Sequence, residues 1–357
     1  MDNDAAILAL DPGGTKCHAL LVRGDGRALS WGSSEGSGLS GRSEQAFLLA
    51  ARRALARHVP ESLTIISLGP RYIPKPAANV FINAYFKLAR RLSIPGRPRP
   101  AAQVCRWLVR KLDIPIVAVI LVKEDEAAMA LAGQPYGLVV LAGTGSFVHG
   151  KTRDGRELHL DGIGPVLGDT GSAYFIGLMA LRAAAKSDWH LRFHTTLLKR
   201  AYSFYGLRNV SELVTFSLKP KDRSVIAAFA RVVDEEASAG DAVARRILLE
   251  AADELADIVQ ATSERLEMTG ESYTMIGTGS VIMHSAIYWM RLCEQVQKFA
   301  PSLTPMRSPH PAVLGFALEA LRLAQCPNYE QAADTLLATY QDVMKQGALN
   351  DISAVSG

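Results

Sequence analysis

The chain has 357 residues, 48% of them hydrophobic and 21% charged, which is ordinary for a soluble globular protein of about two domains. Its longest apolar runs, at 114–122 and 137–143, are only strand-length, which excludes a membrane helix of about 18 apolar residues. The net charge of +4 conceals a basic stretch, because residues 62–112 include no acidic side chain. Such a stretch could meet nucleic acid, an acidic lipid surface or an anionic partner. We expect a solvated face instead, since few aromatic residues and no nucleic-acid motif accompany the charge.

The N-terminal part predicts a strand-rich α/β unit. Apolar runs at 5–11 and 17–23 flank an Asp-Pro-Gly-Gly corner, and a Gly-Asp-Gly turn leads to a third run at 27–33. Further predicted elements are a helix at 43–58, a strand at 62–69, basic helical segments at about 77–93 and 100–111, and a strand at 114–122.

The same plan begins again in the second part of the chain. Residues 137–162 read as strand, Gly-Thr-Gly-Ser corner, strand, Asp-Gly turn and strand. Helices dominate 172–266, a strand ends in a second Gly-Thr-Gly-Ser at 277–280, and helices are predicted at 281–299, 312–324 and 329–346. The repetition predicts two similar units that meet near residues 112–124.

Three glycine corners could bind phosphate: "DPGGTK" (11–16), "AGTGS" (142–146) and "IGTGS" (276–280). Glycine permits positive φ and lets backbone N–H groups approach an anion, although one such corner alone is more often an ordinary hairpin turn. The Thr15 hydroxyl and Lys16 ammonium add donors, and Asp11 could face Mg²⁺. Neither the Walker spacing nor the dinucleotide fingerprint occurs, so phosphate held by hairpin tips of two similar domains is the remaining interpretation.

The order of "DPGGTKCHALLV", "EDEAAMALAG", "LAGTGSFVHG", "GPVLGDTGSAYFIG" and "IGTGS" resembles the actin/hexokinase/Hsp70 superfamily. Within it the chain is most similar to the N-acetylglucosamine kinase and glucosamine kinase branch. That branch shares a domain family with the activator ATPases of benzoyl-CoA reductase and 2-hydroxyglutaryl-CoA dehydratase. The resemblance covers residues 5–325, and "LGDTGSAYFIG" is its most specific part.

The resemblance implies an α/β fold of two ribonuclease H-like (actin-like ATPase) domains that close on ATP in a central cleft. The expected boundaries are 1–118, with a basic insertion at 71–111, and 119–325. A C-terminal helix and tail (326–357) would pack back on the first domain. ATP and Mg²⁺ are the expected cofactors, with Asp11 at the metal.

The resemblance also implies roles for individual residues. Asp125 matches the catalytic aspartate, with Glu124 as its likeliest substitute, whereas carboxylates at a helix start commonly only cap the helix. Asp169 and Ser172 could likewise only cap the following helix. The expected nucleotide contacts are Gly13, Gly14, Thr15, Lys16, Gly143, Thr144, Gly145, Ser146, Gly277, Thr278, Gly279 and Ser280. The expected sugar contacts are Thr144, Gly168, Asp169, Gly171 and Ser172.

The chain departs from that pattern at three places. Glu126 stands where alanine is usual, Thr170 replaces a common glutamate, and the segment 33–43 lacks the asparagine that holds a hexosamine. Ser37 or Ser40 could stand in for that asparagine, although a hydroxyl lacks the reach of an amide.

The leading hypothesis is therefore an ATP-dependent sugar kinase that phosphorylates an amino sugar of the N-acetylglucosamine or glucosamine class. One alternative is a non-catalytic ATP-gated module of the same fold. The other, an activator ATPase, is disfavoured because the four cysteines stand far apart and form no pair for an iron–sulfur cluster. The scattered thiols and the lack of a secretory signal predict a cytoplasmic protein, and a homodimer is expected by analogy.

Overall fold

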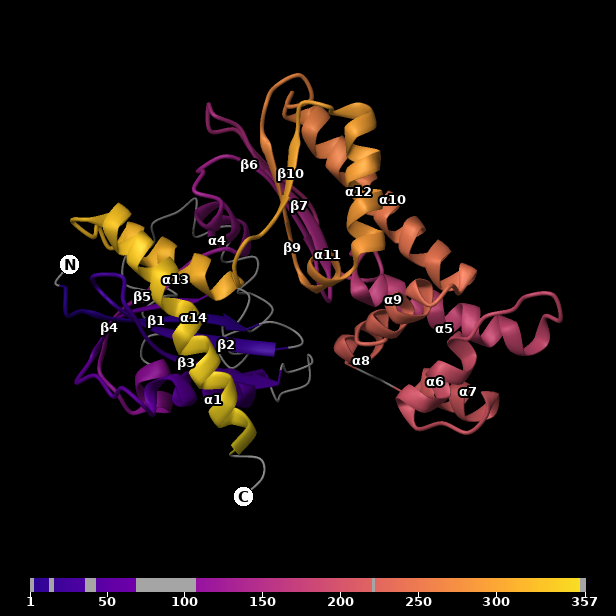
Figure 1. Cartoon of the computed structure of the whole chain (residues 1–357), viewed down its shortest axis with the longest axis horizontal. Helices are drawn as coiled ribbons and strands as arrows, with labels where there is room; N and C mark the ends of the chain where they lie inside the picture. Colours follow the sequence, from indigo (N-terminus) through magenta and orange to yellow (C-terminus); the bar gives the residue numbers. More distant parts are fainter. Residues whose placement is uncertain (1–2, 13–15, 36–42, 69–106, 220–221, 354–357) are drawn as a thin grey trace, which may run out of the picture. The chain divides into compact units, whose positions relative to one another are not determined.

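The computed structural model describes residues 3–12, 16–35, 43–68, 107–219 and 222–353. The chain forms two compact units. Of the described residues, unit 1 takes those up to Leu131 and from His310 onward, and unit 2 takes Ala132–Pro309. Each unit contains one five-stranded sheet (Figure 1).

Unit 1 is built on the strand order β3-β2-β1-β4-β5. The first three strands form an antiparallel meander, and β4 and β5 run parallel to β1. Its elements are β1 (Ala6–Pro12), β2 (Lys16–Arg23), β3 (Ala28–Glu35), α1 (Ser43–Leu55), β4 (Leu63–Leu68), β5 (Ile116–Leu121), α4 (Glu124–Leu131), α13 (Ala312–Leu323) and α14 (Tyr329–Ser353).

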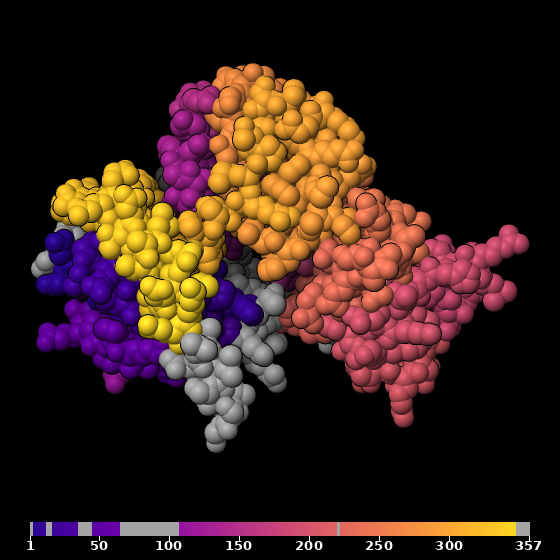
Figure 2. Space-filling view, in the orientation of Figure 1, coloured from indigo at the N-terminus to yellow at the C-terminus, as the bar shows by residue number. Residues whose placement is uncertain are grey.

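Both faces of the first sheet are covered, because successive side chains of a strand point to opposite sides. Ile7 and Ala9 belong to the apolar cluster that includes α4, α13 and α14. Leu8 and Leu10 belong to the cluster that includes α1. In Figure 2 the yellow atoms of α14 cover part of the indigo N-terminal strands. This two-sided burial explains why the β1 sequence is apolar without alternation.

Unit 2 repeats the topology with the order β10-β9-β6-β7-β8. Again three antiparallel strands are followed by two that run parallel to the first of them. Its elements are β6 (Gly137–Ala142), β7 (Ser146–Lys151), β8 (Glu157–Asp161), α5 (Ala173–Trp189), α6 (Leu197–Tyr205), α7 (Val210–Leu218), α8 (Arg223–Ala227), α9 (Ala230–Ser238), α10 (Ala242–Arg265), β9 (Thr274–Thr278), α11 (Ser280–His284), α12 (Ala286–Phe299) and β10 (Thr304–Arg307). Within the described residues, none of these helices, nor any of unit 1, combines the length and apolar character needed to cross a bilayer.

Helices α4 and α13 lie in unit 1, whereas the predicted boundaries at 118/119 and 325/326 assigned them to the second domain. The two helices pack so closely that a Cβ on Gly315 would overlap the carbonyl oxygen of Ala127. Val122, Leu131 and Val313 are buried in the same cluster as Ile7. Without this helix pair, one face of β1 would lose its apolar cover.

Two local differences concern the end of unit 2. The single helix predicted at 281–299 is broken into α11 and α12 at Ser285, whose side chain accepts a hydrogen bond from the Tyr288 N–H at 3.2 Å. Strand β10 was not predicted, because four residues that include Pro305 carry little strand signal of their own.

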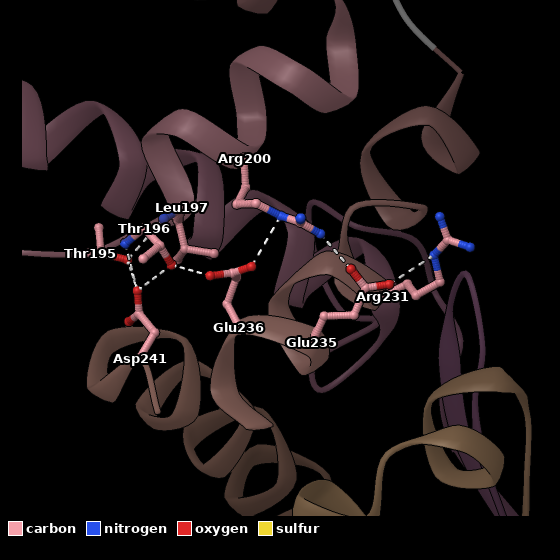
Figure 3. Close-up of polar contacts among 8 residues, drawn as sticks. All are labelled: Thr195, Thr196, Leu197, Arg200, Arg231, Glu235, Glu236 and Asp241. Atoms are coloured by element: carbon pink, nitrogen blue, oxygen red, sulfur yellow. Dashed lines mark hydrogen bonds and ion pairs between the residues drawn. The ribbon is translucent and has the colours of Figure 1, made fainter. Parts of the chain in front are cut away.

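In unit 2, Asp241, the N-cap of α10, links the start of α10 to the start of α6 (Figure 3). One carboxylate oxygen accepts hydrogen bonds from the N–H groups of Val243 and Ala244, both at 2.9 Å. The other accepts from the Thr195 hydroxyl at 2.7 Å and from Thr196, which precedes α6. Burial raises the pKa of the Asp241 carboxyl, but these hydrogen bonds outweigh it and hold the pKa below its ordinary value.

We expect Asp241→Ala to lower the free energy of unfolding by about 1–2 kcal/mol at neutral pH, because two helix starts lose their acceptor. The stability that comes from a lowered pKa is present above the ordinary value of 3.8 and is lost as pH falls below it, so variant and wild type should converge in acid. Thermal unfolding followed by circular dichroism from pH 3 to pH 8, expressed as differences from wild type, measures this.

Glu235→Ala is the matched control, since Glu235 lies in the same network (Figure 3) but pairs with Arg200 and Arg231 at the surface. Exposed ion pairs are worth about 0–1 kcal/mol. Equal losses in the two variants would contradict the role given to Asp241.

Candidate active site

The two Gly-Thr-Gly-Ser corners of unit 2 lie against each other. Strands β6 and β9 are parallel neighbours with Leu141 opposite Thr278, so both corners leave the same edge of the sheet. Gly279 has φ +90°, and a Cβ there would overlap the Ala142 carbonyl and lie 2.9 Å from the Gly143 nitrogen. Only glycine permits this approach, and it brings two predicted nucleotide segments together.

The first corner, at 142–146, is a tight turn held by backbone hydrogen bonds. The Gly143 N–H donates to the Gly145 carbonyl at 2.8 Å, and the Gly143 carbonyl accepts from the Ala173 N–H at 2.8 Å. Thr144 at the tip is half-buried. Hydrogen bonds within the turn and to the start of α5 thus hold the first corner in place.

The second corner offers less to a ligand. Gly277 is buried, and a Cβ there would come within 2.5 Å of the Trp289 ring. Its carbonyl accepts from the Ser308 N–H at 2.8 Å. Of the predicted contacts in this corner, Thr278 and Gly279 are half-buried and Ser280 is exposed.

Asp161, at the end of β8, organises the glycine-rich segment that follows it. Its carboxylate accepts hydrogen bonds from the N–H groups of Asp169 at 2.6 Å and Thr170 at 3.1 Å. A Cβ on Gly168 would overlap the same carboxylate. Gly168 therefore lets the chain fold tightly around Asp161.

Asp169 is the central carboxylate of this segment. Its side chain is 5% exposed and its φ is +56°, so the surrounding contacts hold it in a conformation that a non-glycine residue rarely adopts. One oxygen accepts from the Ser146 N–H at 3.2 Å, and the other forms an ion pair with Arg223. Because a carboxylate oxygen has two lone pairs, each can accept one hydrogen bond more.

The predicted serines hold this arrangement through their hydroxyls. Ser146 is buried and donates to the Thr170 carbonyl at 2.7 Å. Ser172 is also buried and caps α5, accepting from the Phe175 N–H at 3.2 Å, so the capping alternative considered for Ser172 is what the structure has. The Gly171 carbonyl accepts from the Tyr288 hydroxyl at 2.8 Å.

In unit 1, carboxylates gather at the corresponding edge of the other sheet. Asp11 lies near the end of β1, and Glu124 begins α4 just after β5, which is two strands away in the same parallel set. Burial raises the pKa of Asp11 to about 7, and the negative charge of Glu124 adds to the rise. Such a pair of hard oxygen ligands fits a divalent cation, which would relieve both effects.

The three carboxylates that begin α4 have different surroundings. Glu126 accepts a hydrogen bond from the Lys123 N–H at 2.8 Å, and its other oxygen lies 3.7 Å from the Lys123 ammonium, so it caps the helix. Asp125 is 5% exposed and Glu124 is half-buried beside Asp11. Glu126 therefore has the capping role that was considered for this stretch.

The remaining predicted contacts of unit 1 are only partly described. Lys16 is exposed at the start of β2, while Gly13, Gly14 and Thr15 lie outside the described residues, as do Ser37, Ser40 and most of the basic insertion. His18, on β2, is a packed side chain whose ring lies 4.9 Å from that of Trp31. Burial, with a contribution from Lys16, lowers the pKa of His18 to about 4.

Residues 94–320 match the model of the BadF/BadG/BcrA/BcrD ATPase family. The chain belongs to this ATPase family. The matched range includes α4, both Gly-Thr-Gly-Ser corners and the segment 161–172. The resemblance inferred from the motifs is thereby confirmed.

Comparison with individual proteins gives further similarities. The chain is 35% identical over 162 residues to the N-acetylmuramic acid/N-acetylglucosamine kinase of Clostridium acetobutylicum (44% of this chain, 53% of that protein). It is 28% identical over 205 residues to the N-acetyl-D-glucosamine kinase of Dictyostelium discoideum (56% and 64%). The matches thus span about half to two thirds of these relatives. A Chromobacterium violaceum protein, 19% identical and covering 91% of this chain and all of its own, has the same fold with a TM-score of 0.62.

Two residues of the site were not singled out from the sequence. Asp161 lies three residues before the quoted segment "GPVLGDTGSAYFIG", and an aspartate that closes a strand before two glycines was the available signal. Arg223 had no such signal, since it lies 54 residues beyond Asp169 in a helical region.

We expect Asp11→Asn to stabilise the metal-free protein at pH 8 and to have little effect near pH 4. The folded-state pKa of Asp11 is near 7, against an ordinary 3.8, so the free energy of unfolding of wild type falls as pH rises between these two values. Above pH 7 this loss of stability stays constant. The deficit is at most about 4 kcal/mol. Unfolding midpoints in EDTA, taken from pH 4 to pH 8, measure it. A difference between variant and wild type that is independent of pH would show that the carboxyl is not perturbed.

Proposed function

We propose that this protein is an ATP-dependent sugar kinase that transfers the γ-phosphate to a hydroxyl of an amino sugar of the N-acetylglucosamine or glucosamine class. The observation that carries the proposal is the junction of three glycine-rich segments in unit 2, at 142–146, 168–172 and 277–280. The sugar kinase names of both sequence relatives support the same reaction. We also propose a cytoplasmic location, where ATP is at hand, and a homodimer by analogy.

In this proposal the corner at Gly143, Thr144 and Gly145 binds the phosphates of ATP. Its backbone N–H groups can approach phosphate oxygens without obstruction by a Cβ. The segment around Gly279 and Ser280 lies against it and is assigned to the nucleoside side. The corner of unit 1, Gly13 to Lys16, is assigned to the phosphates as well, with the exposed ammonium of Lys16 as the charged donor.

The sugar is assigned to Asp169 and its glycine neighbours, with Thr144. A carboxylate whose oxygens each keep a lone pair can accept hydrogen bonds from two sugar hydroxyls. Gly168 and Gly171 keep the backbone close around it. The buried Ser146 and Ser172 take part by holding the segment in place.

Asp125 is proposed as the general base. The acceptor hydroxyl oxygen attacks the γ-phosphorus, the bond between that phosphorus and the bridging oxygen breaks, and ADP leaves. The hydroxyl proton passes to the Asp125 carboxylate. Burial and a place at the first turn of a helix hold this carboxylate in one position.

Asp11 and Glu124 are proposed to hold Mg²⁺ with the nucleotide. When bound there, Mg²⁺ neutralises negative charge on the phosphate oxygens. The raised pKa of Asp11 near Glu124 supports this assignment, since a cation favours the ionised form of both carboxyls.

The proposal predicts that the purified protein releases ADP from MgATP only when an acceptor sugar is present. Asp125→Asn should lower kcat by about 10²- to 10⁴-fold, because proton transfer to a base is lost. A coupled ADP assay over a panel of hexosamines, N-acetylhexosamines and simple hexoses measures both effects.

Glu126→Gln is the matched control, one residue away on the same helix turn. Its amide oxygen can still accept the Lys123 N–H, so sugar-dependent turnover should stay within about threefold of wild type. ATP hydrolysis that no sugar stimulates would favour the ATP-gated module, and full activity of Asp125→Asn would remove Asp125 from the reaction.

A further inference from the structure

Arg223 contacts the segment 168–172, which is assigned to the sugar, from a separate part of unit 2. It is the first residue of α8, and the preceding Asp222 caps that helix by accepting from the Ser224 N–H at 3.0 Å. Helix α8 packs on α5 so tightly that a Cβ on Gly177 would overlap the Ile226 carbonyl. The backbone of Arg223 is therefore held in place relative to the start of α5, just after Asp169.

The guanidinium of Arg223 is held on two sides. One terminal nitrogen pairs with the Asp169 oxygen that Ser146 does not contact. The guanidinium carbon lies 5.7 Å from the centre of the Tyr174 ring, within reach of a cation–π interaction. Its Nε is buried and has no hydrogen-bond partner among the described residues. In this position the Nε–H donor of Arg223 stays unsatisfied within the described part of the chain, while a terminal nitrogen donates to Asp169.

Stability alone is a poor reason for this pair. An ion pair between a buried carboxylate and a partly buried guanidinium contributes little net free energy, because desolvation of the two groups offsets their attraction. Here the pair also leaves a buried donor unsatisfied and joins a residue with left-handed φ. Interactions of this kind collect where a side chain must be held in one orientation.

We propose that Arg223 is the positioning residue of the sugar site: it holds the Asp169 carboxylate in one orientation, so that its remaining lone pairs accept the sugar hydroxyls. This inference rests on the proposed kinase function and assigns a new residue to it. The chemistry it requires of the substrate is a neutral polyol face that presents hydroxyl donors to a carboxylate.

The experiment compares Arg223→Met and Arg223→Lys with wild type, using MgATP and the best sugar acceptor of the panel. Arg223→Met should raise the KM for sugar by about tenfold or more, with the KM for ATP within about twofold. Arg223→Lys should recover part of the loss, since it keeps the charge but not the planar fork. A side chain that only fills space would leave Lys and Met equally impaired.

Arg291→Met is the matched control. Arg291 pairs with Asp253 at 2.7 Å and 3.0 Å and is 27% exposed, against 26% for Arg223, but it joins α12 to α10. Its sugar KM should be unchanged, and unfolding midpoints of the Met variants show whether either loss is one of folding.

Besides equal impairment of the Lys and Met variants, three results would overturn the inference, and they are distinguishable. An unchanged sugar KM in a folded Arg223→Met, or a rise confined to the KM for ATP, removes Arg223 from the sugar site and leaves the kinase function standing. Absence of sugar-dependent turnover in the wild-type protein overturns the proposed function, and this inference with it.

Discussion

The arrangement in unit 2 depends on the contact between Gly279 and the Ala142–Gly143 backbone. Parallel pairing of β6 and β9 brings two corners to one sheet edge, and the missing Cβ of Gly279 lets them touch. The Gly143 carbonyl then anchors the start of α5 through Ala173, and the Ser146 N–H reaches Asp169. The close approach at Gly279 thus joins the two corners, and the hydrogen bonds of Gly143 and Ser146 join the segment at 168–172 to them.

The two units treat their carboxylates in opposite ways. In unit 2, Asp161 accepts backbone N–H groups, and Asp169 is neutralised by a guanidinium. In unit 1, burial and the charge of Glu124 make ionisation of Asp11 unfavourable. A carboxylate already matched by Arg223 suits neutral hydroxyl groups, whereas one whose ionisation is costly suits a cation. This contrast supports the division of sugar and metal between the units in the proposed function.

Neighbouring residues of one helix start can serve separate purposes. Glu126 closes the first turn of α4 by accepting the Lys123 N–H. Asp125 is nevertheless buried, and burying a carboxylate costs free energy that capping alone does not require. Likewise, the Ser172 side chain caps α5, so the Asp169 side chain is not needed as the cap of that helix.

The sequence by itself determined the repeated α/β plan, the place of the glycine corners and the family, because strand periodicity and glycine requirements are properties of short segments. It also placed Asp125 and Asp169 beside the correct elements. Only the tertiary structure decided that α4 and α13 cover the first sheet, that Ser146 and Ser172 are buried, and that Arg223 meets Asp169. Those outcomes depend on packing and charge between residues far apart in the chain, and a local pattern carries no information on which distant side chain will fill a given space.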